Sequence, residues 1–408
     1  MYKVLHCGDT HLGRKQPSKI NKKRVESSIQ ALDHCVQKAV EEDVDFIVHT
    51  GDVFDTVYPW HSVIDAAKEK LKPLEENEIP MYCIRGNHDR SYGQGRTLKG
   101  LAIEHLENEY FHLIDPSPNQ FQDHKGGYID HDDNIRIYGL GYHSNKTPSI
   151  LREFEPEGDK FNFLLLHDFV DGVTRSYTDN VSKADQIAEK DLDYVAIGHD
   201  HQPNTEKEIN GTTFAATGGT IDYDFNTTEF GKHCNILEID PENGIENLRT
   251  EDVPQKLELR RLKIPIEDAE IDPIRKRIEE ISKDGVDLAL KISIEGKTGK
   301  TDPSSIPTHQ IGQQLEEEFD NVVMAELILN LEIEGYEAEE GDGETFSITE
   351  YLEKNFSDNE ELSNNLQSLH NQTNAALADD QNLTPSGFDL NKESRQNLKK
   401  EVKEALFE

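Results

Sequence analysis

Residues 2–11 of the chain read YKVLHCGDTH, and the rest of the first 240 residues repeats the pattern of this stretch. An apolar run of strand length ends at Gly8, which has no side chain and therefore permits a tight turn. Asp9 and His11 follow the turn, so the strand presents a carboxylate and an imidazole at its carboxyl end. In open α/β folds, ligands bind at this end of the strands.

The same pattern, an apolar run followed by side chains that bind metals, occurs four more times. The later copies are GDVFD at residues 51–55, GNHD at 86–89, HD at 167–168 and GHDH at 198–201. Alone, each of these is more often an ordinary turn or a core histidine than a site. Five copies in order, each after an apolar run, indicate a shared site at one edge of a sheet.

Short apolar runs alternate with amphipathic segments through the first 240 residues, which indicates an α/β fold. Strands are predicted at Tyr2–Gly8, Asp45–Thr50, Pro80–Arg85, Asn134–Gly141, Phe161–His167 and Tyr194–Gly198. Helices are predicted at Val25–Glu42, His61–Asn77, Thr97–Glu107 and Ser182–Lys190. The runs Thr212–Thr217 and His233–Asp240 follow without helices between them, so part of the sheet is expected to be antiparallel.

A turn signal at Pro241–Gly244 separates this region from a smaller α+β unit over residues 255–335. Its strands are predicted at Leu257–Ile266, Leu288–Ile294 and Val322–Glu334, and its helices at Pro273–Lys283 and His309–Phe319. Residues 337–344 have the composition of an acidic linker. Residues 345–408 are predicted to form polar helices, and Leu398, Val402 and Leu406 share one helical face that suits docking on a partner.

The charge of the chain is unusual for any protein that binds a polyanion. Asp and Glu total 81 against 43 Lys and Arg, a net charge of −38. Such a chain repels nucleic acid at ordinary ionic strength, since Lys and Arg normally make the phosphate contacts. Either the substrate is not a polyanion, or the protein works in molar salt, where the Debye length falls to about 3 Å. Because the acid excess extends over nearly every segment, we favour a halophilic, archaeal source.

No apolar run approaches the roughly 20 residues of a membrane span, so no membrane association is expected. The N-terminus runs straight into a predicted strand without a visible signal peptide, and a cytoplasmic location is expected. Four scattered cysteines lack paired spacing, and we interpret them as reduced packing residues.

The residue types at the five strand ends suit a binuclear metal site. Two divalent cations about 3.5–4 Å apart can clamp the attacking and leaving oxygens of a phosphoryl displacement. Such a pair needs one bridging carboxylate, with carboxylate, imidazole and amide ligands completing each shell. This mixture of oxygen and imidazole ligands favours Mn(II), with Fe, Zn or Mg as alternatives.

The ordered set GDTH, GDVFD, GNHD, LLLHD and GHDH resembles the calcineurin-like metallophosphoesterase superfamily. The opening HCGDTHLG at residues 6–13 and the long spacing before His167 resemble its DNA-repair branch. That branch is the SbcD/Mre-eleven nuclease, which works with the SbcC/Rad-fifty ABC-type ATPase. The resemblance implies a metal-dependent DNA exonuclease and endonuclease in double-strand-break repair, and a homodimer.

The same resemblance implies a fold and a division into domains. It predicts a four-layer αββα sandwich of mixed sheets as the nuclease domain over residues 1–250. A small α+β capping domain is expected over 255–335, and a helical tail that binds the ATPase over 345–408.

The family's site residues can be carried over to the matching motifs. By resemblance, three residues bind the first metal, three bind the second and one carboxylate bridges the two. The seven ligands are, in that order, Asp9, His11 and His201; Asn87, His167 and His199; and Asp52. His88 matches the histidine that stabilises the transition state and protonates the leaving oxygen, and a metal-bridging hydroxide would be the nucleophile.

One position departs from the pattern of several archaeal nucleases of this family. Three residues after the bridging aspartate they carry a histidine that is thought to position DNA, where this chain has Asp55. The phosphatase branch also has an aspartate there, hydrogen-bonded to the catalytic histidine. We therefore predict that Asp55 orients His88 and favours its protonated form.

The run RKQPSKINKKR at residues 14–24 opposes the global charge bias. It contains six basic residues and no acid, directly after the first metal-binding motif; they are Arg14, Lys15, Lys19, Lys22, Lys23 and Arg24. We predict that they contact the phosphate backbone of DNA; the alternative is a basic helix start balanced by nearby acids. The loop aromatics Tyr58, Trp60 and Tyr92 either stack on a DNA end or pack beneath their loops.

Two other functions remain open on the sequence alone. A small-substrate phosphodiesterase or phosphatase would use the same motifs, and Asp55 adds some weight to it. The other alternative is an architectural subunit that holds the ATPase and tethers DNA ends. Such a subunit would not need metal ligands, so the complete set of ligands in this chain argues against a purely structural role.

Overall fold

The computed structural model describes residues 1–90, 101–122, 127–157, 160–175, 181–266, 271–297 and 306–332. They belong to a compact unit, Met1–Glu334, and a second unit comprises Gly335–Glu408. The predicted linker and tail helices, with the partner-binding prediction for 345–408, lie outside the described residues, as does Tyr92. Among the helices that are described, none combines the length and apolarity that a membrane crossing requires.

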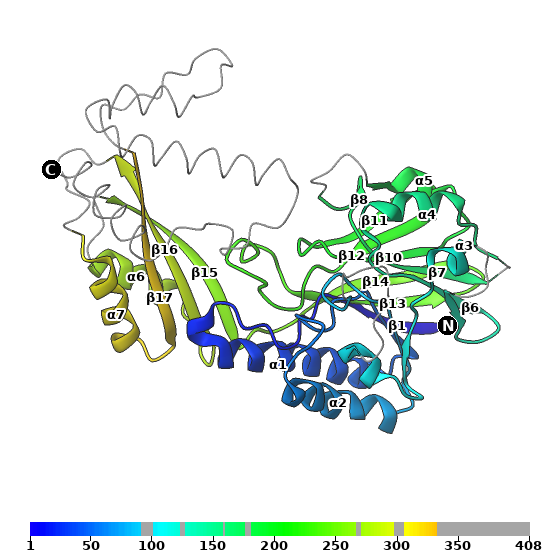
Figure 1. The fold of residues 1–408 in the computed structure, drawn as a ribbon, viewed down its shortest axis with the longest axis horizontal. Coiled ribbons are helices and arrows are strands. Elements are labelled where there is room, and N and C mark those ends of the chain that lie inside the picture. The colour runs from blue at the N-terminus through cyan, green and yellow to red at the C-terminus, as the bar shows by residue number, and fades with distance from the viewer. Residues whose placement is uncertain are drawn as a thin grey trace, which may run out of the picture. The chain divides into compact units, whose positions relative to one another are not determined.

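The first of two large sheets contains the N-terminal strand. Its order is β14-β13-β1-β2-β3-β4 (Figure 1). Strands β1 to β4 are parallel, and β13 pairs antiparallel with both β1 and β14. The strands are β1 Tyr2–Cys7, β2 Phe46–His49, β3 Met81–Cys83, β4 Phe111–Leu113, β13 His233–Asp240 and β14 Gly244–Asp252. Helices α1 (Asn21–Glu41) and α2 (His61–Glu76) pack on its outer face and share a buried apolar core with it.

The second large sheet has the order β11-β12-β10-β7-β6-β5. The four strands from β12 to β6 are parallel, and antiparallel strands close both edges. Its strands are β5 Tyr128–Asp130, β6 Ile135–Leu140, β7 Phe161–His167, β10 Tyr194–Gly198, β11 Asn204–Ile209 and β12 Thr212–Ala216. The shorter elements nearby are α3 Pro118–Gln122, α4 Thr147–Glu153, α5 Ala184–Ala188, β8 Val170–Asp171 and β9 Ser182–Lys183.

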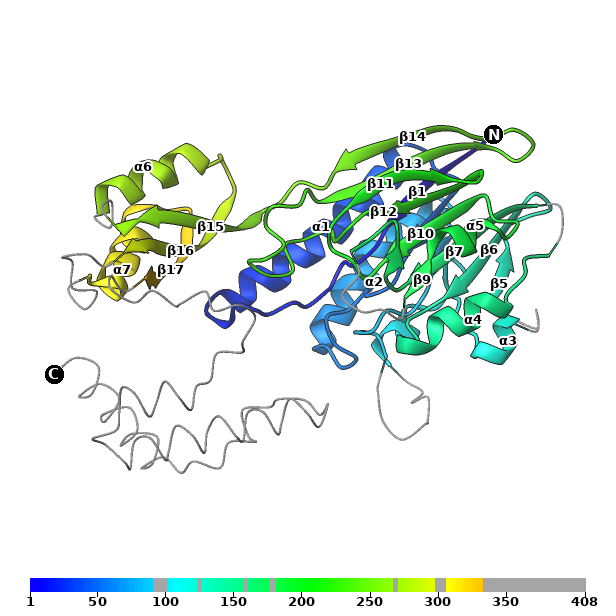
Figure 2. The ribbon, with the colours of Figure 1, turned by 90° about the horizontal axis from the view of Figure 1, so that it is seen from above.

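The two sheets pack face to face. Val4 and Phe46 from the first sheet share one buried cluster with Phe163, Leu165 and Ala196 from the second. Helices α4 and α5 cover the outer face of the second sheet, so the layers run helix, sheet, sheet, helix (Figure 2). The predicted four-layer αββα sandwich of mixed sheets is confirmed. Because the central strands are buried on both faces, their sequences are nearly continuous apolar runs.

A third, smaller sheet follows the sandwich, with strands β15 Leu257–Pro265, β16 Asp287–Lys297 and β17 Val322–Glu332. Both strand pairs are parallel. Helices α6 (Ile271–Ile281) and α7 (Thr308–Glu318) cross over between successive strands, so this unit is α/β and the α+β prediction is wrong in that respect. One face packs on α6 and α7, and the other packs against Ile20, which directly precedes α1.

The prediction of Thr97–Glu107 as an α-helix also needs correction. Its described part is a 3₁₀-helix, η2, over Ala102–Leu106; two other 3₁₀-helices are η1 Ser18–Ile20 and η3 Ser144–Lys146. The edge strands β4, β5, β11 and β14 were not predicted. The sequence of β14, GIENLRTED, is polar, and a half-exposed edge strand gives only a weak apolar signal.

Arg24 is a structural residue of α1. Its side chain is fully buried, and its guanidinium donates hydrogen bonds to the main-chain carbonyls of Gln16, Asp222 and Tyr223. The Asp222 carboxylate in turn accepts the Leu259 N–H of β15 at 2.9 Å. Arg24 therefore fastens the loop between β12 and β13 to α1, and Asp222 fastens that loop to the third sheet.

Replacing Arg24 with Ala should lower the free energy of unfolding by about 3 kcal/mol, because one buried and two partly buried carbonyl groups lose their donor. Lys22→Ala is the matched control on the same helix, since the Lys22 side chain is 88% exposed, and its effect should stay within about 0.5 kcal/mol. Guanidinium denaturation of both variants measures this. Equal stabilities of the two variants would show that the Arg24 contacts do not hold the loop.

Candidate metal centre

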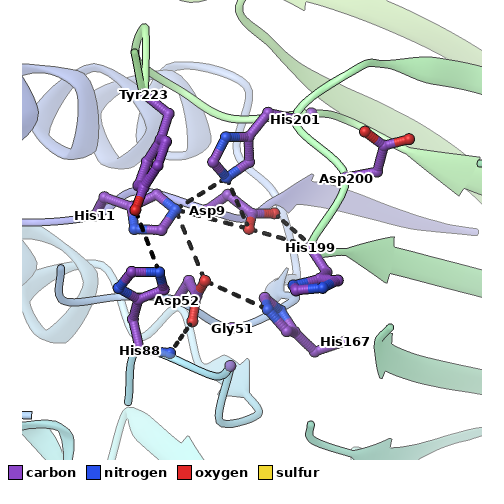
Figure 3. A network of polar contacts seen from close by, with 12 residues as sticks. Asp9, His11, Gly51, Asp52, His88, His167, His199, Asp200, His201 and Tyr223 are labelled. Atoms are coloured by element: carbon purple, nitrogen blue, oxygen red, sulfur yellow. Dashed lines mark hydrogen bonds and ion pairs between the residues drawn. The ribbon is translucent and has the colours of Figure 1, made fainter. Parts of the chain in front are cut away.

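All seven predicted ligands lie at the carboxyl ends of strands of the two large sheets. Figure 3 labels all of them except Asn87. The first sheet contributes Asp9 and His11 after β1, Asp52 after β2 and Asn87 after β3. The second contributes His167 as the last residue of β7, and His199 and His201 after β10. The packing of the two sheets therefore brings together side chains that are up to 192 residues apart, as Asp9 and His201 are.

The ligands predicted for the first metal form one group. Nε2 of His11 lies 3.1 Å from Nε2 of His201. Nε2 of His201 is 3.6 Å from Asp9 Oδ1, and Nε2 of His11 is 3.9 Å from the same oxygen. Ligand atoms of these three residues all lie within 4.8 Å of one another, which a single cation can span.

The ligands predicted for the second metal form an adjacent group. The Asn87 side-chain oxygen is 3.1 Å from His167 Nε2 and 2.9 Å from His199 Nδ1. Oδ2 of Asp52 lies 3.4 Å from His167 Nε2 and 3.7 Å from His11 Nε2. The Asp52 carboxylate thus stands within reach of an imidazole from each group, as a bridging ligand requires.

The chemistry of these donors fits divalent cations. His167 Nδ1 lies 2.6 Å from the Thr50 carbonyl oxygen, which only accepts, so Nδ1 carries a proton and Nε2 faces the carboxylate. Burial alone would lower the pKa of His167, but the Asp52 carboxylate raises it to about 9. The site therefore attracts positive charge at Nε2, which is where a bound cation would displace that proton.

Burial and neighbouring charges keep other residues of the site in the protonation state that a metal ligand needs. Burial, together with the neighbouring His167, lowers the pKa of His199 to about 3, so His199 is neutral. Burial also places the pKa of His11 well below its ordinary value. Although burial alone would raise the pKa of Asp52, the imidazoles of His167 and His11 bring it below its usual range. Neutral imidazoles and an ionised carboxylate have lone pairs available.

Four of the predicted ligands have a strained main chain. Asp9, His11, Asp52 and His199 have φ angles of 48°, 43°, 52° and 82°, in the left-handed region. Residues other than glycine adopt such angles rarely, at a cost of about 1–3 kcal/mol, and chiefly at functional sites. Hydrogen bonds from the Asp9 and His11 N–H groups to the Gly51 and Asp52 carbonyls hold the conformations of Asp9 and His11.

The glycine before Asn87 is needed for close approach. A Cβ atom on Gly86 would lie 1.9 Å from Asp52 Oδ1. Gly51 is needed for two reasons. Its φ of +95° is one that other residues rarely adopt, and a Cβ atom there would lie 2.8 Å from His167 Nδ1. Gly86 is therefore required by the close approach of the Asp52 carboxylate.

Residues 2–203 match the family model of the calcineurin-like phosphoesterases. The chain contains a calcineurin-like phosphoesterase domain. A "DNA double-strand break repair protein Mre11" of Methanococcus maripaludis is 29% identical over 228 residues, which cover 53% of this chain and 56% of the relative. A protein of the same name from Archaeoglobus fulgidus is 26% identical over 323 residues, which cover 70% of this chain and 67% of that one.

A bacterial relative and two solved structures are also similar to the chain. One of the subunits of the SbcCD nuclease of Staphylococcus epidermidis is 26% identical over 308 residues, covering 68% of this chain and 75% of the relative. A 5'-nucleotidase precursor of Thermus thermophilus covers 62% of this chain and 54% of its own, at 12% identity and a TM-score of 0.37. A dimetal phosphatase of Danio rerio covers 62% and 99%, at 12% identity and a TM-score of 0.34. The chain spans about half the length of several curated relatives that it matches.

In the phosphoesterase domain, His88 lies beside the first ligand group. Its main-chain N–H donates to Asp52 Oδ1 at 2.8 Å, and its ring packs edge-on against that of His11. Nδ1 of His88 lies 2.8 Å from the main-chain carbonyl oxygen of Asp55. Because a carbonyl only accepts, Nδ1 carries the hydrogen and Nε2 is the nitrogen that can act on a substrate.

The prediction was that Asp55 orients His88, and the contact between them is made by the main chain of Asp55 and not by its carboxylate. That carboxylate accepts a hydrogen bond from Arg14 Nη1 at 3.0 Å and lies 3.6 Å from His11 Nδ1. Asp55 does orient His88, but through its main-chain carbonyl, which an Asp→Asn replacement would not remove. The motif correctly placed the two residues together, and only the three-dimensional position of Arg14 shows where the side chain points.

The basic run is only partly available to a ligand of the phosphoesterase domain. Arg24 is fully buried and cannot contact DNA, so that prediction is wrong. Lys19 pairs with Glu316 and Lys23 with Asp287, each at 2.6 Å, and both acids belong to the third-sheet unit.

The remaining three residues of the run have different surroundings. Arg14 lies over the Tyr223 ring with its guanidinium carbon 3.6 Å from the ring centroid. Lys15 places Nζ 3.6 Å from the ring centroid of Trp60, which is 52% exposed. The Lys22 side chain is 88% exposed, with Glu26 3.8 Å away.

Asp200 is a site residue of the phosphoesterase domain to which the sequence motifs gave no role. It stands between His199 and His201 but points away from the centre (Figure 3). Its buried carboxylate accepts hydrogen bonds from the guanidinium and the main-chain N–H of Arg175 and from the Gln202 N–H. It thereby holds the loop that presents the two histidines. The acid in the middle of GHDH was a signal for this role.

Replacing Asp200 with Asn should weaken Mn(II) binding about 10- to 100-fold, the usual cost of losing a group that orients metal ligands. Asp185→Asn is the matched control, since Asp185 is an exposed carboxylate at the start of α5. Titration calorimetry on both variants measures the affinity. An affinity of Asp200→Asn equal to that of the control would contradict the role of the Arg175 contact.

Proposed function

We propose that this chain is a metal-dependent nuclease that hydrolyses phosphodiester bonds of DNA in double-strand-break repair. The observation that carries the proposal is the Asp52 carboxylate, placed within 3.7 Å of imidazole nitrogens from both ligand groups. The names of the curated relatives support DNA as the substrate. Asp9, His11 and His201 would hold one divalent ion, Asn87, His167 and His199 a second, and Asp52 both; Mn(II) is the expected metal.

The residues of the chain have separable tasks in this reaction. When bound, two divalent ions would neutralise the charge of the phosphate and make water a better nucleophile. His88 would donate a proton from Nε2 to the leaving oxygen, while the Asp55 carbonyl holds Nδ1 and fixes the tautomer. The Asp52 carboxylate also accepts a hydrogen bond from the His88 main-chain N–H, which holds the metal ligand and the proton donor in a fixed relative position.

The exposed aromatic and basic residues that follow the ligand motifs in the sequence support a nucleic acid more than a small ester. Tyr58 and Trp60 are 65% and 52% exposed, and Lys15 lies over the Trp60 ring. A cation among exposed aromatic rings suits an unpaired DNA end, where bases stack and phosphates pair with the cation. Lys22 is a further exposed cation of the same run. Because the chain carries a net charge of −38, we propose that it binds DNA in high salt, as a halophilic protein would.

The partners and the domain limits also remain proposals. We propose a nuclease domain over 1–250, a capping domain over 255–335 and a tail over 345–408 that binds an SbcC/Rad-fifty type ATPase. One relative is named as a subunit of a nuclease, which supports an assembly for that protein. A homodimer is proposed on the resemblance alone.

The proposal is tested with linear double-stranded DNA and Mn(II) in molar salt, comparing the wild type with His88→Ala. Loss of the general acid should lower the cleavage rate about 100- to 10,000-fold. His105→Ala is the matched control, since His105 is an exposed histidine of η2. It should cleave DNA at the wild-type rate.

The substrate comparison separates the alternatives. Cleavage of DNA that requires His88 supports the nuclease. Hydrolysis confined to mononucleotide esters would replace it with a small-substrate phosphodiesterase on the same site. DNA binding without any hydrolysis would favour the architectural role.

A further inference from the structure

Tyr223, in the loop between β12 and β13, is a residue of the metal centre that no motif revealed. Its ring centroid lies 4.7 Å from the ring centroids of both His11 and His201. Its hydroxyl oxygen lies 3.4 Å from Nε2 of His88 (Figure 3). Since Nδ1 of His88 is engaged by the Asp55 carbonyl, Tyr223 contacts the nitrogen that faces the substrate.

The position of Tyr223 is fixed from several sides. Arg14 places its guanidinium over the ring and donates from Nε to the Tyr223 carbonyl at 3.1 Å. Buried Arg24 donates to the carbonyls of Asp222 and Tyr223. The Asp222 carboxylate is held by Lys232 at 3.0 Å and by the Leu259 N–H of β15. A surface tyrosine would not need this many contacts to its main chain and ring.

We propose that Tyr223 is a positioning residue that aims Nε2 of His88 at the leaving oxygen of the substrate. This inference rests on the proposed phosphodiesterase function. The Asp55 carbonyl alone fixes one nitrogen and leaves the tilt of the imidazole ring unrestrained. The Tyr223 hydroxyl restrains the opposite nitrogen, because a hydroxyl can donate to neutral Nε2 or accept from protonated Nε2.

In the reaction Tyr223 transfers no atom. Water forms the new bond to phosphorus and releases a proton to solvent, and the bond from phosphorus to the leaving oxygen breaks. The leaving oxygen keeps the electron pair of that bond and takes the proton from Nε2, which leaves His88 neutral. A small error in the direction of Nε2 slows this transfer, because proton donation requires hydrogen-bond geometry.

A second role for Tyr223 predicts a different result. The Tyr223 ring could serve only as an apolar surface against which the imidazoles of His11 and His201 pack. Tyr223→Phe keeps the ring and the Arg14 contact with it but removes the hydroxyl. The variant therefore separates the two roles, and Phe is too similar in shape to disturb the fold.

The test measures kcat and KM of Tyr223→Phe with Mn(II) on two phosphodiesters that differ in the leaving group. One releases p-nitrophenol, which needs no proton to leave; the other is a dinucleotide, which releases a sugar hydroxyl and does. On the dinucleotide, kcat should fall about 10-fold with KM within about 2-fold of the wild type, as loss of one aligned hydrogen bond predicts. On the nitrophenyl ester, kcat should not change.

Three controls sharpen the result. Tyr128→Phe removes a hydroxyl from a tyrosine that also lies beneath an arginine, Arg136, but on the edge strand β5, and both rates should be those of the wild type. Mn(II) affinity by calorimetry should be equal in Tyr223→Phe and the wild type, because all ligands remain. In a His88→Ala background, Tyr223→Phe should have no further effect, since a positioning residue acts only through its partner.

Each remaining outcome overturns the inference. Equal losses of kcat on both esters would show that the hydroxyl acts on a step other than protonation of the leaving oxygen, and no loss on the dinucleotide would reduce the role of Tyr223 to packing of its ring against His11 and His201. A wild type that hydrolyses neither linear DNA nor either ester would instead refute the proposed function itself. That result is distinct, because it does not involve the variant.

Discussion

The Asp52 carboxylate imposes the tightest constraint in this molecule. Its two oxygens contact His11, His167 and the His88 N–H, which come from three different strand ends. The carboxylate fits only because Gly86 has no Cβ atom, which would otherwise lie 1.9 Å from Oδ1. The φ of 52° at Asp52 is a further cost of placing it there.

The surrounding loops are arranged to maintain this position. Buried Asp89 accepts N–H groups from Gly86, Val53 and Phe54, and so ties the loops after β2 and β3 together. Burial, together with the nearby Asp52 carboxylate, raises the pKa of Asp89 to about 6. The face-to-face packing of the two sheets then supplies the histidines from the other side. A sandwich of two sheets is thus the means by which one carboxylate reaches imidazoles far away in the chain.

The sequence predicted the central features of this arrangement for a simple reason. Each ligand motif directly follows an apolar run, and parallel strands place their carboxyl ends at one edge, so proximity followed from the local pattern. Roles that depend on distant residues could not be predicted this way. Arg24 was assigned to DNA because its neighbours in the sequence are basic, yet its partners include carbonyls of residues almost 200 positions later. The Asp55 carboxylate was misassigned since Arg14 approaches it only in the folded chain.

Other features that the sequence did not predict also depend on residues distant in the chain. Tyr223 lies in a loop without a motif, and its relation to His88 spans 135 residues. The polar edge strand β14 carries little apolar signal, and the parallel pairing of β15, β16 and β17 cannot be derived from their separate sequences. Local sequence therefore predicted which side chains reach the site, whereas long-range packing determines how they are held.

The most direct test of a shared Asp52 is the electron paramagnetic resonance spectrum of the protein loaded with Mn(II), together with the metal stoichiometry. Two ions bridged by one carboxylate should give two Mn(II) per chain and an exchange-coupled spectrum, and Asp52→Ala should abolish the coupling. One ion per chain, or two ions with uncoupled spectra in the wild type, would contradict the account.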